Sequence, residues 1–233
     1  MSALAHVFEN AGLATVGISI VRGQAERSRP PRMLHCEFPL GRPLGIPGDA
    51  VFQHRVLAAA FDLLTRVDLP VLIDFPETIV DDADTPLSCV LPPRHNADIP
   101  AALDEFIGLR PAWNRRLASS GQTSVVRFAG PENLHAAIAS FVKIADGEDW
   151  QHAGLSVGEL SQAAADIRAY YEEVALELTG HTPLARQSES WLYRATAMGL
   201  LLRRAQAALK AANAPREAWF RLVPTAQPPA PSA

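Results

Sequence analysis

The sequence predicts an α/β fold, with a small, mostly parallel sheet on its N-terminal side and a largely helical C-terminal part. Near the N-terminus, helical patterns alternate with short β-branched runs, which is typical of strands joined by helical crossovers. In the last third, apolar residues recur at spacings of three and four, as on the buried face of a helix. We therefore expect helix to exceed strand by more than two to one.

The first elements follow from periodicity and from turn residues. Residues 3–11 place their large apolar side chains on one helical face, and Gly12 follows where a helix end favours a left-handed residue. Residues 14–21 alternate β-branched side chains with small ones, which predicts a strand. A second strand is expected at residues 32–38, because Pro30-Pro31 ends any helix that precedes it.

A Gly/Pro-rich loop at residues 39–49 connects this second strand to a long helix. Asp49 is a suitable N-cap for that helix, which is expected over residues 50–67. Residues 69–75 fit either a strand or an extended loop. The stretch 76–100 carries five prolines and an acidic patch, and it predicts a long surface excursion that serves as a lid or an interface arm.

The remainder is expected to be mainly helical, ending in two long helices that form an antiparallel hairpin. Before the hairpin we expect helices at residues 101–109, after Pro111 and at 131–145, and a strand at 123–128. The first hairpin helix is expected to begin at a capping box formed by Ser156 and Glu159 and to end at Gly180, and the second is expected at 188–213. The corresponding division is an α/β domain at 1–150, a helical hairpin at 151–224 and a disordered tail at 225–233.

Composition excludes several classes of protein. Of the 233 residues, 48% are hydrophobic and 20% are charged, with a net charge of -4, which argues against a nucleic-acid binder. No apolar run reaches the roughly 18 residues that a membrane span requires. We therefore expect a cytoplasmic globular protein that binds neither nucleic acid nor membrane. Two cysteines rule out a disulfide scaffold and an all-cysteine metal site.

The common motifs of catalysis are absent. The sequence has no G-x-G-x-x-G, P-loop, H-E-x-x-H or G-x-S-x-G pattern, and no two of its seven histidines are spaced i, i+4. We expect no metal and no cofactor, and no catalytic residue is assigned. Cys36 is interpreted as a small buried core residue, and Cys89 has no neighbour that would lower the pKa of its thiol.

The Gly/Pro-rich loop is the best candidate for a substrate-binding site. Its glycines allow the backbone to approach a ligand, and nearby arginines can present guanidinium groups to a carboxylate. The start of the following helix also favours an anion. The candidate residues are Arg22, Arg32, Gly41, Arg42, Gly45, Asp49 and Gln53. The alternative interpretation is that Asp49 only caps the helix and that the arginines are solvated.

An ordered series of motifs runs through residues 3–64. It consists of Glu9–Val16, Pro30-Pro31-Arg32, the run from Phe38 to Asp49, and Gln53 in the next helix. The series resembles the glycine/sarcosine/betaine/D-proline reductase selenoprotein B family over about a quarter of the chain. The resemblance implies reductive chemistry on amino-acid-like substrates, in which a selenocysteine or cysteine attacks the activated substrate carbon and thiols supply the electrons.

The chain departs from the family at the redox motif. In the family this motif precedes the helix that here begins at Ala3, and neither Cys36 nor Cys89 corresponds to it, so no catalytic residue carries over. Three interpretations remain: a reductase subunit whose nucleophile lies on a partner, a non-catalytic small-molecule-binding or scaffold protein, and an enzyme of another class.

The resemblance favours the first of these, an oxidoreductase-type subunit acting on a small carboxylate-bearing substrate. A second reductase subunit or a further copy of the chain is the expected partner. Because an α/β unit normally opens with a strand and this chain opens with a helix, the strand at 14–21 is expected at a sheet edge that a partner could extend.

Overall fold

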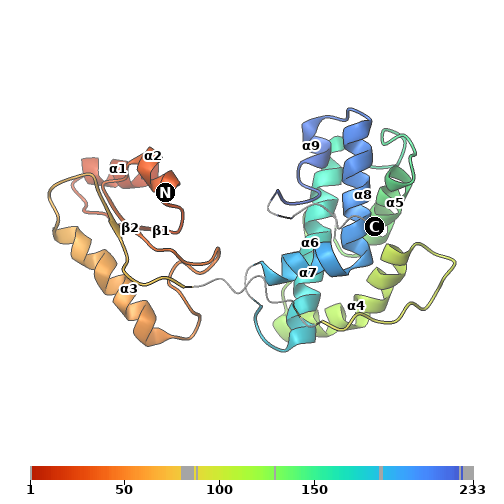
Figure 1. Ribbon diagram of the computed structural model, residues 1–233, viewed down its shortest axis with the longest axis horizontal. Coiled ribbons are helices and arrows are strands. Elements are labelled where there is room, and N and C mark those ends of the chain that lie inside the picture. Colours follow the sequence, from red (N-terminus) through yellow and green to blue (C-terminus); the bar gives the residue numbers. More distant parts are fainter. Residues whose placement is uncertain are drawn as a thin grey trace. The chain divides into compact units, whose positions relative to one another are not determined.

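The chain divides into two compact units, Met1–Asp84 and Thr85–Ala233 (Figure 1). The computed structural model describes residues 2–79, 87, 89–128, 130–183, 186–225 and 227, so the acidic patch at 81–84 and most of the tail lie outside the described residues. The boundary expected near residue 150 falls instead within the proline-rich stretch. The reason is that the helices between 101 and 145 bury their apolar faces against later helices of the chain.

The first unit contains a parallel sheet of three short strands in the order β1-β2-β3. Their bounds are Gly17–Ser19 for β1, Arg32–His35 for β2 and Val71–Asp74 for β3. The small parallel sheet predicted for the N-terminal side is thereby confirmed, and the ambiguous segment at 69–75 forms a strand. The register places Ser19 beside His35, and His35 beside Asp74.

Three helices and a 3-10 turn accompany this sheet: α1 Ser2–Asn10, α2 Arg22–Ser28, α3 Ala50–Asp62 and η1 Leu63–Thr65. Figure 1 shows α1 and α2 on the opposite side of the strands from α3. The core lies beneath α3, where the rings of Phe38, Phe52 and Phe75 have centroids 5.5 to 5.9 Å apart. Leu34 and Cys36 of the central-strand segment complete this core.

An ion pair holds α1 in place. None of the residues of α1 is buried, yet Glu9 near its end accepts hydrogen bonds from the Thr15 hydroxyl at 2.9 Å and from Arg32 Nη1 at 2.6 Å. Arg32 also donates to the Arg66 carbonyl from Nε at 3.1 Å and from Nη2 at 2.9 Å. A single buried guanidinium therefore joins α1, β2 and the turn that leads to β3.

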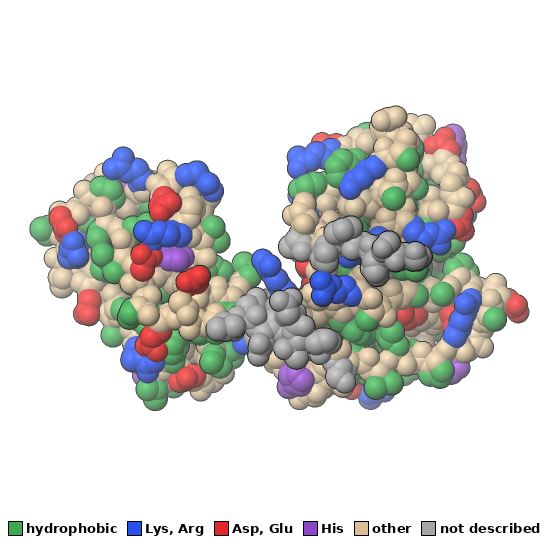
Figure 2. All heavy atoms as spheres, in the orientation of Figure 1, with side chains coloured by type: hydrophobic (Ala, Val, Ile, Leu, Met, Phe, Trp, Pro, Cys, Tyr) green, Lys and Arg blue, Asp and Glu red, His purple; other side chains and the backbone are tan. Residues whose placement is uncertain are grey.

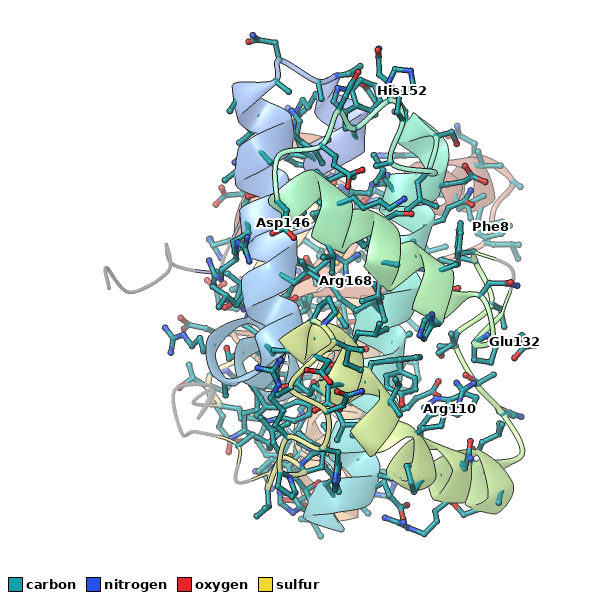
Figure 3. The ribbon with its side chains drawn as sticks, turned by 90° about the vertical axis from the view of Figure 1, so that its right-hand side faces the viewer. Phe8, Arg110, Glu132, Asp146, His152 and Arg168 are labelled. Atoms are coloured by element: carbon teal, nitrogen blue, oxygen red, sulfur yellow. The ribbon has the colours of Figure 1, made fainter. Side chains whose placement is uncertain are left out.

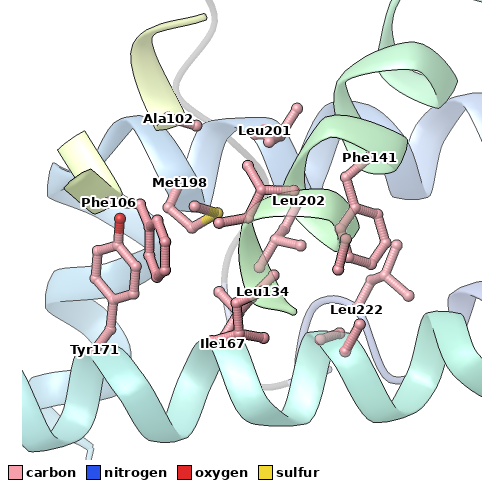
Figure 4. Close-up of a cluster of buried hydrophobic side chains, with 14 of the residues drawn as sticks. Ala102, Phe106, Leu134, Phe141, Ile167, Tyr171, Met198, Leu201, Leu202 and Leu222 are labelled. Carbon is pink, nitrogen blue, oxygen red and sulfur yellow. The ribbon is translucent and has the colours of Figure 1, made fainter. Parts of the chain in front are cut away.

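The second unit is a helical bundle, which confirms the predicted excess of helix over strand. Its helices are α4 Ala101–Ser120, α5 Leu134–Ala145, α6 Val157–Thr179, α7 Gln187–Ala195, α8 Ala197–Ala211 and α9 Arg216–Trp219. Figure 4 shows Phe106, Phe141, Ile167 and Leu202, from four of these helices, meeting in one core. Arg168 on α6, which is labelled in Figure 3, donates to the Arg221 carbonyl and so fastens the segment after α9.

Two helix boundaries differ from the sequence-based expectation. Pro111 lies inside a continuous α4, where a break between two helices was expected. The second hairpin helix is divided at Thr196, whose backbone is extended and whose hydroxyl oxygen accepts from the Gly199 amide at 3.0 Å. The α8 segment after this break packs chiefly against α5 and α4, so the predicted two-helix hairpin is replaced by a bundle.

The strand predicted at residues 123–128 is also absent, because carboxylates on α6 take its backbone donors. Glu173 accepts from the Ser124 amide at 2.6 Å, and Asp166 accepts from the amides of Arg127 and Phe128 at 2.8 to 3.0 Å. Both carboxylates are buried. The amides that a neighbouring strand would have bonded are therefore satisfied by side chains.

Replacing Gly199 by alanine tests the close approach of α7 and α8. An added Cβ would overlap the Leu192 carbonyl and lie 2.6 Å from the Tyr193 Cα. Because both obstacles are backbone, Gly199→Ala should lower the free energy of unfolding by about 1–3 kcal/mol. Urea unfolding followed by circular dichroism measures this change.

Gly158→Ala is the matched control, because nothing lies within 4 Å of a Cβ at that helical position. It should leave the stability unchanged or raise it by up to about 1 kcal/mol. Equal midpoints for the two variants would contradict the packing of α7 against α8.

Candidate functional site

The carboxyl ends of the three parallel strands lie at one edge of the sheet, where α/β proteins commonly bind ligands. Most of the sequence-predicted binding residues follow the end of a strand: Arg22 after β1, and Gly41, Arg42, Gly45, Asp49 and Gln53 after β2. Only Arg32 does not, because it is the first residue of β2 and so belongs to the opposite edge. Six of the seven candidates thus follow the carboxyl end of a strand along the chain, and Arg22 also contacts the end of β3 through Asp74.

Three polar residues that were not predicted form a row at this edge. Ser19, His35 and Asp74 end their strands in register and share one face of the sheet. His35 Nδ1 lies 3.0 Å from Asp74 Oδ1, and the Ser19 hydroxyl donates to the Val21 carbonyl at 3.1 Å. Each is the last residue of its strand in the structure, but the strands expected from the sequence extend beyond all three, so the sequence carried no signal for this row.

Arg22 extends this polar row from the start of α2. It forms ion pairs with Asp74 and, at 3.0 Å, with Glu26 on the same helix. The side chains of Arg22 and Asp74 are about half exposed, whereas that of His35 is 13% exposed. In Figure 2, basic and acidic side chains are interspersed on the visible face of the Met1–Asp84 unit. The edge therefore offers one cation and one oriented imidazole, with a carboxylate between them.

The Gly/Pro-rich loop is held largely by its own contacts. Asp49 accepts from the Phe52 amide at 2.9 Å and so caps α3, and Gln53 Nε2 donates to the Ile46 carbonyl at 2.8 Å. Gly45 has a φ of 93°, and a Cβ there would collide with the Phe52 ring. Asp49, Gln53 and Gly45 therefore have structural roles in the loop, which agrees with the alternative interpretation that Asp49 only caps the helix.

Arg42 and Gly41 differ from the rest of the loop. Among the described residues, no hydrogen bond or ion pair involves the Arg42 guanidinium, and this residue is only half-buried. Gly41 is exposed, with a φ of 85° that favours glycine. Of the loop candidates, these two are the ones that remain available to a ligand.

Arg32 has a different role from the one predicted. Its side chain is only 7% exposed, and its donors are directed to Glu9 and to the Arg66 and Thr15 carbonyls. The pKa of Glu9 is lowered, mainly by the hydrogen bond from the Thr15 amide, so the carboxylate stays charged beside this arginine. Arg32 therefore stabilises the first unit and presents no free donor to the carboxyl edge.

The two thiols are not activated. Cys36 is fully buried, and burial raises the pKa of its thiol to about 11. Burial also raises the pKa of the Cys89 thiol, which lies in the other unit. A nucleophilic thiol requires the opposite shift.

Within the described ranges, no three His, Cys, Asp or Glu side chains are grouped to hold a metal ion. None of the described helices combines the length and the apolar character needed to cross a bilayer.

No family model, curated protein or solved structure matches the chain. The candidate site therefore rests on geometry alone: the His35–Asp74 pair with Arg22 at the carboxyl edge, Arg42 in the loop that follows β2, and two thiols whose pKa values are raised.

The reactivity of Cys36 provides a direct test of its burial. With its pKa at about 11 instead of 9.0, the thiolate fraction near pH 8 should be on the order of 100-fold lower than for an ordinary thiol. In a Cys89→Ser variant, the single remaining thiol should react with Ellman's reagent slowly in the native state and rapidly in urea. Its native rate should keep rising above pH 9, because deprotonation is delayed. Rapid native reaction at pH 8 would show that Cys36 is accessible.

Proposed function

We propose that the chain is a subunit of a selenoprotein B-like reductase, which binds a small carboxylate-bearing, amino-acid-like substrate and takes its nucleophile from a partner polypeptide. The resemblance of residues 3–64 supports the family. The assignment of substrate binding to this chain and of the nucleophile to a partner rests on two observations taken together. The carboxyl edge has accessible arginines, and the pKa values of both thiols are raised.

The carboxyl edge has the chemistry for the binding half of this role. A guanidinium group pairs with a carboxylate through two parallel hydrogen bonds. Arg42 has no such partner among the described residues, whereas Arg22 already pairs with Asp74 and Glu26 and would add its charge to the edge. Asp74 contacts Nδ1 of His35, which orients the imidazole and leaves Nε2 as its second polar atom. The partner would then supply the thiol or selenol that attacks the substrate carbon.

A non-catalytic small-molecule-binding or scaffold role is the second candidate. It is favoured by the same raised thiol pKa values, and by the structural partners that Asp49 and Gln53 already have. The two roles differ in whether turnover appears when a thiol-bearing partner is added.

Reductase assays separate these roles. The isolated chain, with dithiothreitol as electron donor, should not reduce glycine, sarcosine, betaine or D-proline, because neither thiol is activated. Activity should appear when the product of the neighbouring gene is added. Turnover by the chain alone that is abolished by Cys36→Ser or Cys89→Ser would overturn the subunit proposal, and no activity in either assay would favour the binding or scaffold role.

Substrate binding is tested by removing one guanidinium at a time. Arg42→Gln should weaken betaine binding measured by calorimetry by about 10- to 150-fold, because a charge-assisted hydrogen bond is worth roughly 1.5–3 kcal/mol. Arg27→Gln is the matched control, since Arg27 is an exposed arginine near the other end of α2. Equal affinities for these two variants would remove Arg42 from the site.

A further inference from the structure

Strand β1 leaves the backbone hydrogen-bonding groups of its middle residue, Ile18, without a partner strand. It forms an edge of the described sheet and pairs only with β2. The Ser19 carbonyl accepts from the Cys36 amide at 2.8 Å, so Ser19 faces β2. Residues of a parallel strand alternate between bonding one side and the other, so the N–H and C=O groups of Ile18 point away from β2.

The two edges of the sheet are protected to different degrees. The segment around β1, residues 13–21, contains neither a charge nor a proline. The segment around β3 contains Asp68, Pro70, Asp74 and Pro76. Charges and prolines are the usual means of preventing an exposed edge from pairing with another chain. The β1 edge lacks these means, although the same sheet has them at its other edge.

An apolar surface borders this unprotected edge. Leu4 and Phe8 of α1, Leu13 before β1 and Phe61 of α3 are between 45% and 59% exposed. All except Leu13 line a groove of about 390 Å³ that also includes Val16. Four large side chains that are each about half exposed leave ~400 Å² of apolar surface uncovered, since a Phe buries 150–250 Å² when fully covered. This is about half of the roughly 800 Å² that each partner contributes to a standard interface.

We propose that β1 pairs antiparallel with β1 of a second copy of this chain, which joins the two sheets into one across a two-fold axis. Such an interface uses the same patch on both copies. The patch suits this because its exposed large side chains are apolar, and because Arg32, which also lines the groove, is buried and paired with Glu9. Ile18 would lie opposite Ile18 of the second copy and exchange two hydrogen bonds with it. The exposed side chains of α1 would cover the groove of the second copy. This proposal does not depend on the reductase function.

Sedimentation velocity of the full chain over a range of micromolar concentrations tests the proposal. We expect a species of twice the 25.1 kDa chain mass. Ile18→Pro removes the outward amide without touching the pairing to β2, and Leu4→Glu places a charge in the apolar surface. Each should raise the dissociation constant at least 10-fold.

Two matched controls should leave the dimer intact. Leu72→Pro makes the same change at the other edge, because Val71 and Phe75 donate to β2 and the amide of Leu72 points outward. Val51→Glu adds a charge at a position of the same unit that is 72% exposed.

Each outcome of these measurements decides the proposal. A strict monomer at all concentrations would overturn it, including a monomer that binds a strand of another protein. A dimer that survives both Ile18→Pro and Leu4→Glu would place the interface elsewhere. If Ile18→Pro reduces the helical circular-dichroism signal, Leu4→Glu decides alone, because α1 has no buried residue to disturb.

Discussion

The first unit depends on the buried guanidinium of Arg32. It bonds Glu9 in the last turn of α1 and the Arg66 carbonyl before β3, so it holds together segments that the small core does not reach. Because this polar contact fixes α1, the helix does not need to bury its apolar face. Leu4 and Phe8 therefore stay exposed on a helix that is nevertheless held in place. The ion pair that stabilises the unit therefore also allows the apolar side chains of α1 to remain on the surface.

Carboxylates have the corresponding role in the second unit. Asp166 and Glu173 accept backbone amides from an irregular segment, and Glu105 accepts the amides of Ala197 and Met198 at the start of α8. Burial raises the pKa of Glu105, and the hydrogen bonds it accepts oppose that shift. Buried polar groups must find partners, and here the partners are the loop and helix-end amides that lack a backbone acceptor. This arrangement allows the irregular connections to pack against a helical core.

The sequence predicted the elements whose causes are local. The Ser156 capping box, the Asp49 cap and the left-handed Gly12 each involve residues a few positions apart, and each is present. The predictions that were wrong depended on contacts between residues that are far apart in the sequence. The run at 123–128 is β-branched, but its donors are taken by carboxylates about 40 to 50 positions away. In the sequence, Arg32 resembles a ligand-binding arginine; the structure shows that its donors bond Glu9 and the Arg66 carbonyl instead. The His35–Asp74 pair requires the register of β2 against β3, which no spacing in the sequence reveals.

The two proposed sites use different boundaries of one sheet, and this makes them compatible. Hydrogen bonds between strands run sideways, so pairing through Ile18 occupies the β1 edge and leaves the carboxyl ends of the strands open. In an antiparallel arrangement the carboxyl ends of the two sheets point in opposite directions. Each copy would then keep its own Arg22, His35 and Asp74 accessible to a ligand, and no residue of the polar row would be needed for the dimer. Binding of a small carboxylate and association of the chain are therefore expected to be independent.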